Sequence, residues 1–200
     1  ATRGSLLASA GVRKKTVGRI TSYDGFVTLY RTSSGPSIAN LAAPGVNEGE
    51  PCSFTATLAD PVGFSLWAEI NWGDGSQEST LAPSGAFVRS HTYGDNGTYS
   101  VTLTVTDVED AQDSKTITVT VSNVPPKNLA LSTSSTLEDQ PYSATLTAQD
   151  VAADPLTWLK SGGAEWLTVT QQGKVSGTPP QDFNGIVSLS VQVSDGDGGS

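Results

Sequence analysis

The sequence has little of the chemistry on which most enzymes and disulfide-stabilised proteins depend. Among its 200 residues there are one cysteine, one histidine and no methionine. A single cysteine, Cys52, excludes an internal disulfide framework and a metal site built from several cysteines. Its neighbours in "PCSFTATL" alternate between polar and apolar residues, which predicts that Cys52 is buried in a strand rather than exposed as a reactive thiol.

Long apolar runs and catalytic motifs are also missing. No run approaches the roughly 18 to 20 apolar residues of a transmembrane helix, so this segment is not expected to span a membrane. The sequence has no GxSxG, no HExxH and no phosphate-binding loop. Catalysis by His91 would need a nucleophile or acid beside it, and none stands out in the sequence, which favours a structural hydrogen bond over general-base catalysis. We therefore expect no enzymatic activity and no catalytic residue.

Positive charge is scarce outside the first 44 residues. The net charge is −9. Residues 1–44 carry six basic residues against Asp24, a net charge of +5, so the remainder carries −14. An acidic body argues against nucleic acid as a partner, because phosphate contacts need a basic surface. The "RKK" run near the start is interpreted as a solvated basic tail.

What the sequence does contain is short alternating segments and turn residues, with 21 glycines and 11 prolines. In "CSFTATLAD", "SLWAEINWG", "TYSVTLTVTD" and "SKTITVTVSN", threonine and serine alternate with apolar residues, a pattern typical of half-buried antiparallel strands. The prolines of "SNVPPKN" mark a boundary between two domains. Residues 1–44 are expected to be a linker or the remnant of an upstream β-domain, with one hairpin in "GRITSYDGFVTLYR" that turns at Asp-Gly.

Three motifs in the first half occur in an order that resembles a known family. They are "VNEGEPCSFTATLADP", "INWGDGS" and "HTYGDNGTYSVTLTVTD", and they are similar to the signatures of the PKD (polycystic-kidney-disease) domain. The resemblance covers residues 46–124 and implies an Ig-like β-sandwich of the kind found in surface proteins. We assign the first domain to residues 45–124.

The second half resembles the dystroglycan-type cadherin-like domains of large surface proteins. The resemblance is carried by "LEDQPYSATLTAQDVAADPLTW", "GKVSGTP" and "VQVSDGDGGS", and the second domain is assigned to residues 125–200. The family continues past "DGDGG" into a last strand, so the resemblance implies a sandwich that lacks this strand. Residues 186–194 should then form a strand with one unpaired side. The expected fold class is all-β, with two tandem Ig-like β-sandwiches after an N-terminal hairpin or linker.

Acidic residues in two loops of the second domain are the candidate metal ligands. In an Ig-like sandwich the loops "QDVAADP" and "SDGDGGS" meet at the end where the chain enters. Calcium takes six to eight oxygen ligands, so carboxylates gathered there predict a calcium site near the proline linker, formed by Asp150, Asp154, Asp195 and Asp197. The alternative is that these loops only turn tightly and keep the domain soluble. Asp60, Asp107 and Asp110 should gather at the corresponding end of the first domain, with weaker metal prospects.

The "WGDGS" motif is interpreted as a turn. Gly73 and Gly75 permit positive φ angles, and Asp74 can accept hydrogen bonds from its own local backbone. A phosphate site would need a helix after the glycines, and "SQESTLAP" does not form one.

These observations predict a non-catalytic extracellular or cell-surface module that acts as a spacer or protein-contact domain, stiffened by calcium. The expected partners are other domains of the same chain and a protein or glycan ligand at a cell surface. The alternative is an accessory module that targets a secreted hydrolase to its substrate or to carbohydrate.

Overall fold

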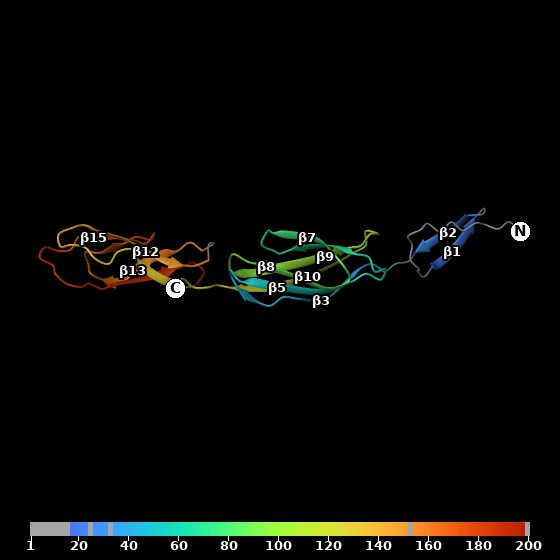
Figure 1. The fold of residues 1–200 in the computed structure, drawn as a ribbon, viewed down its shortest axis with the longest axis horizontal. Coiled ribbons are helices and arrows are strands. Elements are labelled where there is room, and N and C mark those ends of the chain that lie inside the picture. Colours follow the sequence, from blue (N-terminus) through green and yellow to red (C-terminus); the bar gives the residue numbers. More distant parts are fainter. Residues whose placement is uncertain (1–16, 24–25, 32–33, 152–153, 199–200) are drawn as a thin grey trace.

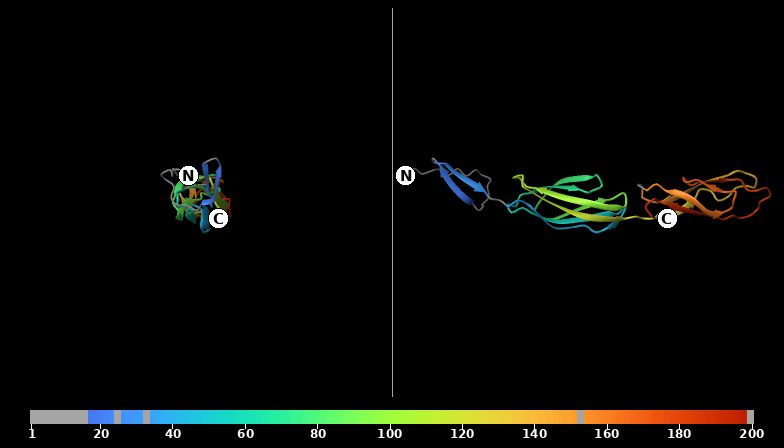
Figure 2. Two further views of the ribbon diagram at one scale, coloured as in Figure 1. Left: turned by 90° about the vertical axis from the view of Figure 1, so that its right-hand side faces the viewer. Right: turned by 180° about the vertical axis from the view of Figure 1, so that it is seen from behind.

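The computed structural model describes residues 17–23, 26–31, 34–151 and 154–198. Every regular element in these ranges is a strand, and strands make up 55% of the structure. Figure 1 shows two β-sandwiches in a row along the long axis of the molecule. The end-on view in Figure 2 superimposes them, so they are stacked end to end rather than side by side. The predicted all-β fold with two tandem sandwiches is confirmed.

The N-terminal hairpin is formed by β1 (Val17–Tyr23) and β2 (Phe26–Arg31), which pair antiparallel with Tyr23 opposite Phe26. This register agrees with the hairpin predicted from "GRITSYDGFVTLYR". The Asp24-Gly25 turn itself lies outside the described residues.

The first sandwich consists of a three-stranded and a five-stranded sheet. The smaller sheet has the order β3 (Ser37–Ala42), β5 (Pro51–Ala59), β8 (Gly85–Thr92). The larger has the order β4 (Val46–Asn47), β10 (Gln112–Ser122), β9 (Gly97–Thr106), β6 (Leu66–Asn71), β7 (Gln77–Ala82). Only β4 runs parallel to its neighbour, β10. Because β3 pairs with β5, the first sandwich begins upstream of residue 45.

Alternation along these strands builds a core between the two sheets. Phe54 on β5 and Val101, Leu103 and Val105 on β9 are fully buried, with polar residues between them. Cys52 is buried as predicted. Trp72 is buried, whereas Trp67 is 47% exposed, as expected for two positions on opposite faces of one strand region.

The described residues of the second sandwich form six strands. One sheet has the order β11 (Lys127–Leu131), β12 (Tyr142–Gln149), β15 (Lys174–Gly177), β14 (Thr168–Val169), and the other pairs β13 (Thr157–Gly163) with β16 (Leu189–Ser194). Its buried core is centred on Trp158, Val175 and Val193. Within the described part of the chain, β16 pairs with β13 alone, which leaves one side of β16 without a neighbouring strand.

Candidate functional site

The linker between the two sandwiches is hydrogen-bonded to both of them. The backbone N–H of Val124 donates to Oε1 of Glu48 in the first sandwich over 2.6 Å. The Nδ2 group of Asn123 donates to Oδ2 of Asp195 in the second sandwich over 2.9 Å. Glu48 is held in turn by the bond from its own N–H to the carbonyl of Ser122. These contacts fix the path of the chain between the domains.

Glu48 occupies the turn between β4 and β5, and the next residue, Gly49, lies close to the second domain. Gly49 has a φ of +73°, and its N–H donates to the carbonyl of Tyr93 over 2.8 Å. A Cβ atom at Gly49 would lie 3.6 Å from Cγ2 of Val151, in the loop between β12 and β13. The turn therefore faces the second sandwich directly, and Glu48 faces the junction with it.

Three carboxylates from the two domains converge at this junction. Glu48, Asp95 and Asp154 each offer one oxygen, and the three oxygens lie within 4.8 Å of one another. Glu48 is 2% exposed and Asp154 is 8% exposed, whereas Asp95 is exposed. Neither Oε2 of Glu48 nor Oδ2 of Asp154 has a hydrogen-bond partner in the described part of the chain. We call these three residues the junction cluster.

The electrostatic consequence is clearest at Asp154. Burial raises the pKa of Asp154 to about 6. The increase is reinforced by the nearby negative charges of Glu48, Asp150, Asp197 and Asp95. Both effects disfavour the ionised carboxylate. The junction is thus a region of concentrated negative charge that a cation would relieve.

The structure places all four predicted calcium ligands in loops at this junction, in different roles. Asp154 belongs to the junction cluster. Asp195 is fully buried and accepts from Asn123 and, through Oδ1, from the N–H of Asp197. Asp150 accepts the N–H of Val151 through Oδ1, and its buried Oδ2 lacks a partner among the described residues. Asp197 is exposed.

Sequence reasoning missed Glu48 and Asp95. It considered the acidic loops where each domain begins, but in a tandem the start of the second domain faces the end of the first. The turn "NEGE" and the loop "YGDNG" lie at that end, and each contributes one carboxylate. The signal was available, because antiparallel topology places both loops at the end where β10 leaves the first sandwich.

The predicted turn in the "WGDGS" motif is confirmed. Gly73 and Gly75 have φ angles of +86° and +94°. Asp74 accepts the N–H and the hydroxyl of Ser76 through Oδ1, and Nε2 of His91 lies 2.6 Å from Oδ2. Burial acts to raise the pKa of Asp74, but the hydrogen bonds from Ser76 and the proximity of His91 outweigh it and lower the pKa. His91 also stacks on Trp72, in agreement with the structural role predicted for it.

At the opposite end of the first sandwich, aspartates cap turns. Asp60 accepts the N–H of Val62, and Asp107 accepts the N–H groups of Glu109 and Ala111. Asp110 has a positive φ of 63°. Across the ranges that the structure describes, the junction holds the one cluster of three potential metal ligands.

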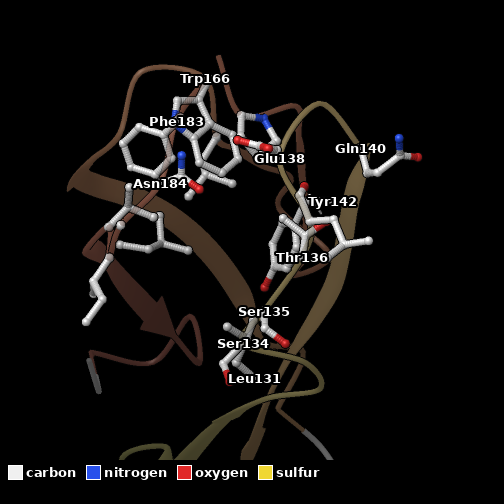
Figure 3. Close-up of a pocket in the computed structure, with 17 residues that line it drawn as sticks. Leu131, Ser134, Ser135, Thr136, Glu138, Gln140, Tyr142, Trp166, Phe183 and Asn184 are labelled. Carbon is white, nitrogen blue, oxygen red and sulfur yellow. Dashed lines mark hydrogen bonds between the residues drawn. The ribbon is translucent and has the colours of Figure 1, made fainter. Parts of the chain in front are cut away.

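A second candidate site is a cavity in the second sandwich, remote from the junction. β12 and β16 end at the junction, and the cavity lies beside their first residues, Tyr142 and Leu189. Its volume is about 870 Å³. Figure 3 shows aromatic and polar side chains together along its wall, among them Tyr142, Trp166, Phe183, Glu138, Gln140 and Asn184. This combination suits a ligand with both apolar faces and hydroxyl groups.

Comparison with known families divides the chain at the linker. Residues 34–121 match the PKD domain, and residues 123–200 match the bacterial Ig domain. The first match confirms the expected PKD domain, and the second shows a bacterial Ig domain where a dystroglycan-type cadherin-like domain was expected; no domain of the latter type is shown. No curated protein matches the chain significantly.

Solved structures include similar domains. The PKD domain of an M14-like peptidase from a Thermoplasmatales archaeon is 30% identical, and the alignment covers 45% of this chain and 98% of that one with a TM-score of 0.42. The PKD1 domain of Vibrio anguillarum Epp is 26% identical, and the alignment covers 45% of this chain and 96% of that one with a TM-score of 0.37. A structure of carbohydrate-binding modules from the β-sandwich superfamily is 20% identical, and the alignment covers 82% of this chain and 55% of that one with a TM-score of 0.41. In the described part of the chain, no segment forms a helix of the length and apolarity required to cross a bilayer.

Proposed function

Because the chain carries a PKD domain followed by a bacterial Ig domain, we propose that it is a non-catalytic spacer in an extracellular or cell-surface protein. Domains of these two families are typically non-catalytic and typical of extracellular proteins. In this role the pair holds the parts of the protein on either side of it at a defined distance and orientation. Its partners are the adjoining domains of the same chain and a protein or glycan ligand at the surface.

The observation that carries this proposal is the attachment of the linker to both sandwiches. A spacer must resist bending, and a flexible linker would be rich in glycine and serine. This linker instead contains Pro125 and Pro126, whose rings fix two backbone torsions. The two residues before them are held by Glu48 on one side and Asp195 on the other.

Small-angle X-ray scattering of the chain tests this proposal. We expect the wild-type curve to fit one extended arrangement of the two sandwiches. Asn123→Ala removes the bond to Asp195 and should require a wider range of interdomain angles. The control is Asn184→Ala, in an exposed loop at the other end of the second sandwich, which should leave the curve unchanged. A wild-type curve that fits only a broad ensemble of bent forms would contradict the proposal.

The cavity in the second sandwich supports a second candidate function, the targeting of a secreted hydrolase to carbohydrate. Aromatic rings offer flat apolar faces, and the carboxylate and amide groups beside them can bond hydroxyls. A glycan array tests the targeting function, because targeting requires this cavity to bind glycan whereas holding two parts of a protein apart does not. If the cavity is the site, Trp166→Ala should abolish the signal, while replacement of the exposed Trp67 in the first sandwich should not.

A further inference from the structure

The spacing of the junction cluster suits a single metal ion. Calcium binds its oxygen ligands at about 2.3 to 2.6 Å, so two oxygens on the same ion lie at most about 5 Å apart. The three oxygens of Glu48, Asp95 and Asp154 meet this condition without any movement, since all lie within 4.8 Å of one another. Two of these residues belong to the PKD domain and one to the bacterial Ig domain.

A second observation, independent of the spacing, also points to a ligand. Glu48 and Asp154 are more than nine-tenths buried, and each retains a carboxylate oxygen that no described residue hydrogen-bonds. A buried polar atom without a partner is unfavourable, and a buried charge is far more so. The remaining oxygen of Glu48 accepts the Val124 N–H, which fixes the carboxylate and leaves Oε2 for another partner. A cation at the cluster would satisfy both orphaned oxygens.

The donor set favours calcium among the common cations. The cluster contains carboxylate oxygens only, with neither histidine nor cysteine, whereas zinc sites are built largely from those two residues. Two other buried side-chain oxygens of the junction also lack a partner in the described ranges, Oδ1 of Asn123 and Oδ2 of Asp150. Calcium accepts six to eight oxygens in irregular geometry, while magnesium demands a near-ideal octahedron.

We propose that the junction cluster is a calcium site shared by the two domains, with Glu48 and Asp95 supplied by the PKD domain and Asp154 by the bacterial Ig domain. The ion neutralises three converging carboxylates and joins the domains directly. Its structural consequence, a stiffer junction, rests on the proposed spacer function. The expected dissociation constant is about 10⁻⁴ to 10⁻³ M, the range of extracellular calcium modules.

Isothermal titration of the chelator-treated chain with CaCl₂ tests the site. We expect binding of one ion to the wild type, and an affinity loss of about tenfold or more for Glu48→Gln, Asp95→Asn and Asp154→Asn, because each removes a charged ligand while preserving shape. The matched control is Asp110→Asn, which removes one negative charge at the far end of the PKD domain and should leave the affinity within about twofold. Parallel titration with MgCl₂ should give weaker binding.

Asp95→Asn keeps this test decisive if a buried variant fails to fold, because Asp95 is exposed. Melting curves in chelator should show Asp95→Asn to be at least as stable as the wild type, because the substitution removes one of the converging negative charges. The inference is overturned if the wild type binds no calcium, or if Glu48→Gln and Asp95→Asn bind it as tightly as the wild type does. If the chain binds no calcium but scattering still gives one arrangement of the two sandwiches, the calcium site is refuted and the spacer function stands. Conversely, if the wild type binds calcium but scattering shows a broad range of bent forms, the spacer function is refuted and the calcium site stands.

Discussion

The two sandwiches share an Ig-like plan but differ in how completely their strands are paired. In the first, β9 lies between β10 and β6, and seventeen buried apolar residues form its core. In the second, β16 pairs with β13 alone among the described strands, and the core has six. A strand that has a neighbouring strand on each of its two edges can bury every second side chain along its length. We infer that the first sandwich carries most of the stability and the second is the weaker partner.

Truncation of a core side chain should give the largest contrast. Phe54→Ala in the first sandwich should lower the free energy of unfolding by about 3 to 5 kcal/mol, because Phe54 is fully buried and packs edge-on against Trp72. Leu167→Ala in the second should lower it by about 2 kcal/mol, since a smaller core with a strand paired on one side relaxes more easily. Urea unfolding followed by circular dichroism and tryptophan fluorescence measures both. Equal losses for the two variants would refute the comparison.

A glycine pair in the first sandwich tests its tight packing. Gly75→Ala introduces a side chain at positive φ with open space around it, at a cost of about 1 to 2 kcal/mol. Gly73→Ala adds a clash, because its Cβ would lie 2.8 Å from the carbonyl oxygen of Ser100. Thermal unfolding should therefore show a larger loss for Gly73→Ala. Similar melting temperatures for the two variants would show that the backbone around Gly73 shifts to accommodate the added Cβ atom.

A smaller effect, a loss of stability in the first sandwich, should appear when acidification protonates Asp74. The pKa of Asp74 is lower in the folded state than its ordinary value, so its ionised form contributes stability at neutral pH. This contribution is present above the unfolded pKa and is lost as the pH falls through the folded pKa. Unfolding experiments between neutral pH and about pH 2 should show that loss in the wild type and less of it in Asp74→Asn. Parallel pH profiles for the two proteins would assign the acid sensitivity to other carboxylates.

Much of the fold followed from local pattern, because period-two alternation fixes which residues of a strand are buried. The hairpin and the glycine turn followed in the same way. β7 (Gln77–Ala82) was not predicted, since "QESTLA" does not alternate between polar and apolar residues and has one β-branched residue, Thr80. It forms a strand by pairing with β6. The junction cluster was predicted in part. Asp154 is in a loop that local rules identify, whereas Glu48 and Asp95 become neighbours of it only through the stacking of two domains.

We infer that the junction sets one orientation of the two sandwiches, and the distance between them can be measured in solution. Spin labels can be placed at the exposed residues Ser79 and Ser143 after substitution by cysteine, because the native Cys52 is 2% exposed and should escape labelling. Pulsed dipolar spectroscopy should give a single narrow distance distribution in millimolar calcium. The distribution should broaden on chelation and in Glu48→Gln. A broad distribution for the wild type in calcium would show that the junction does not set one orientation.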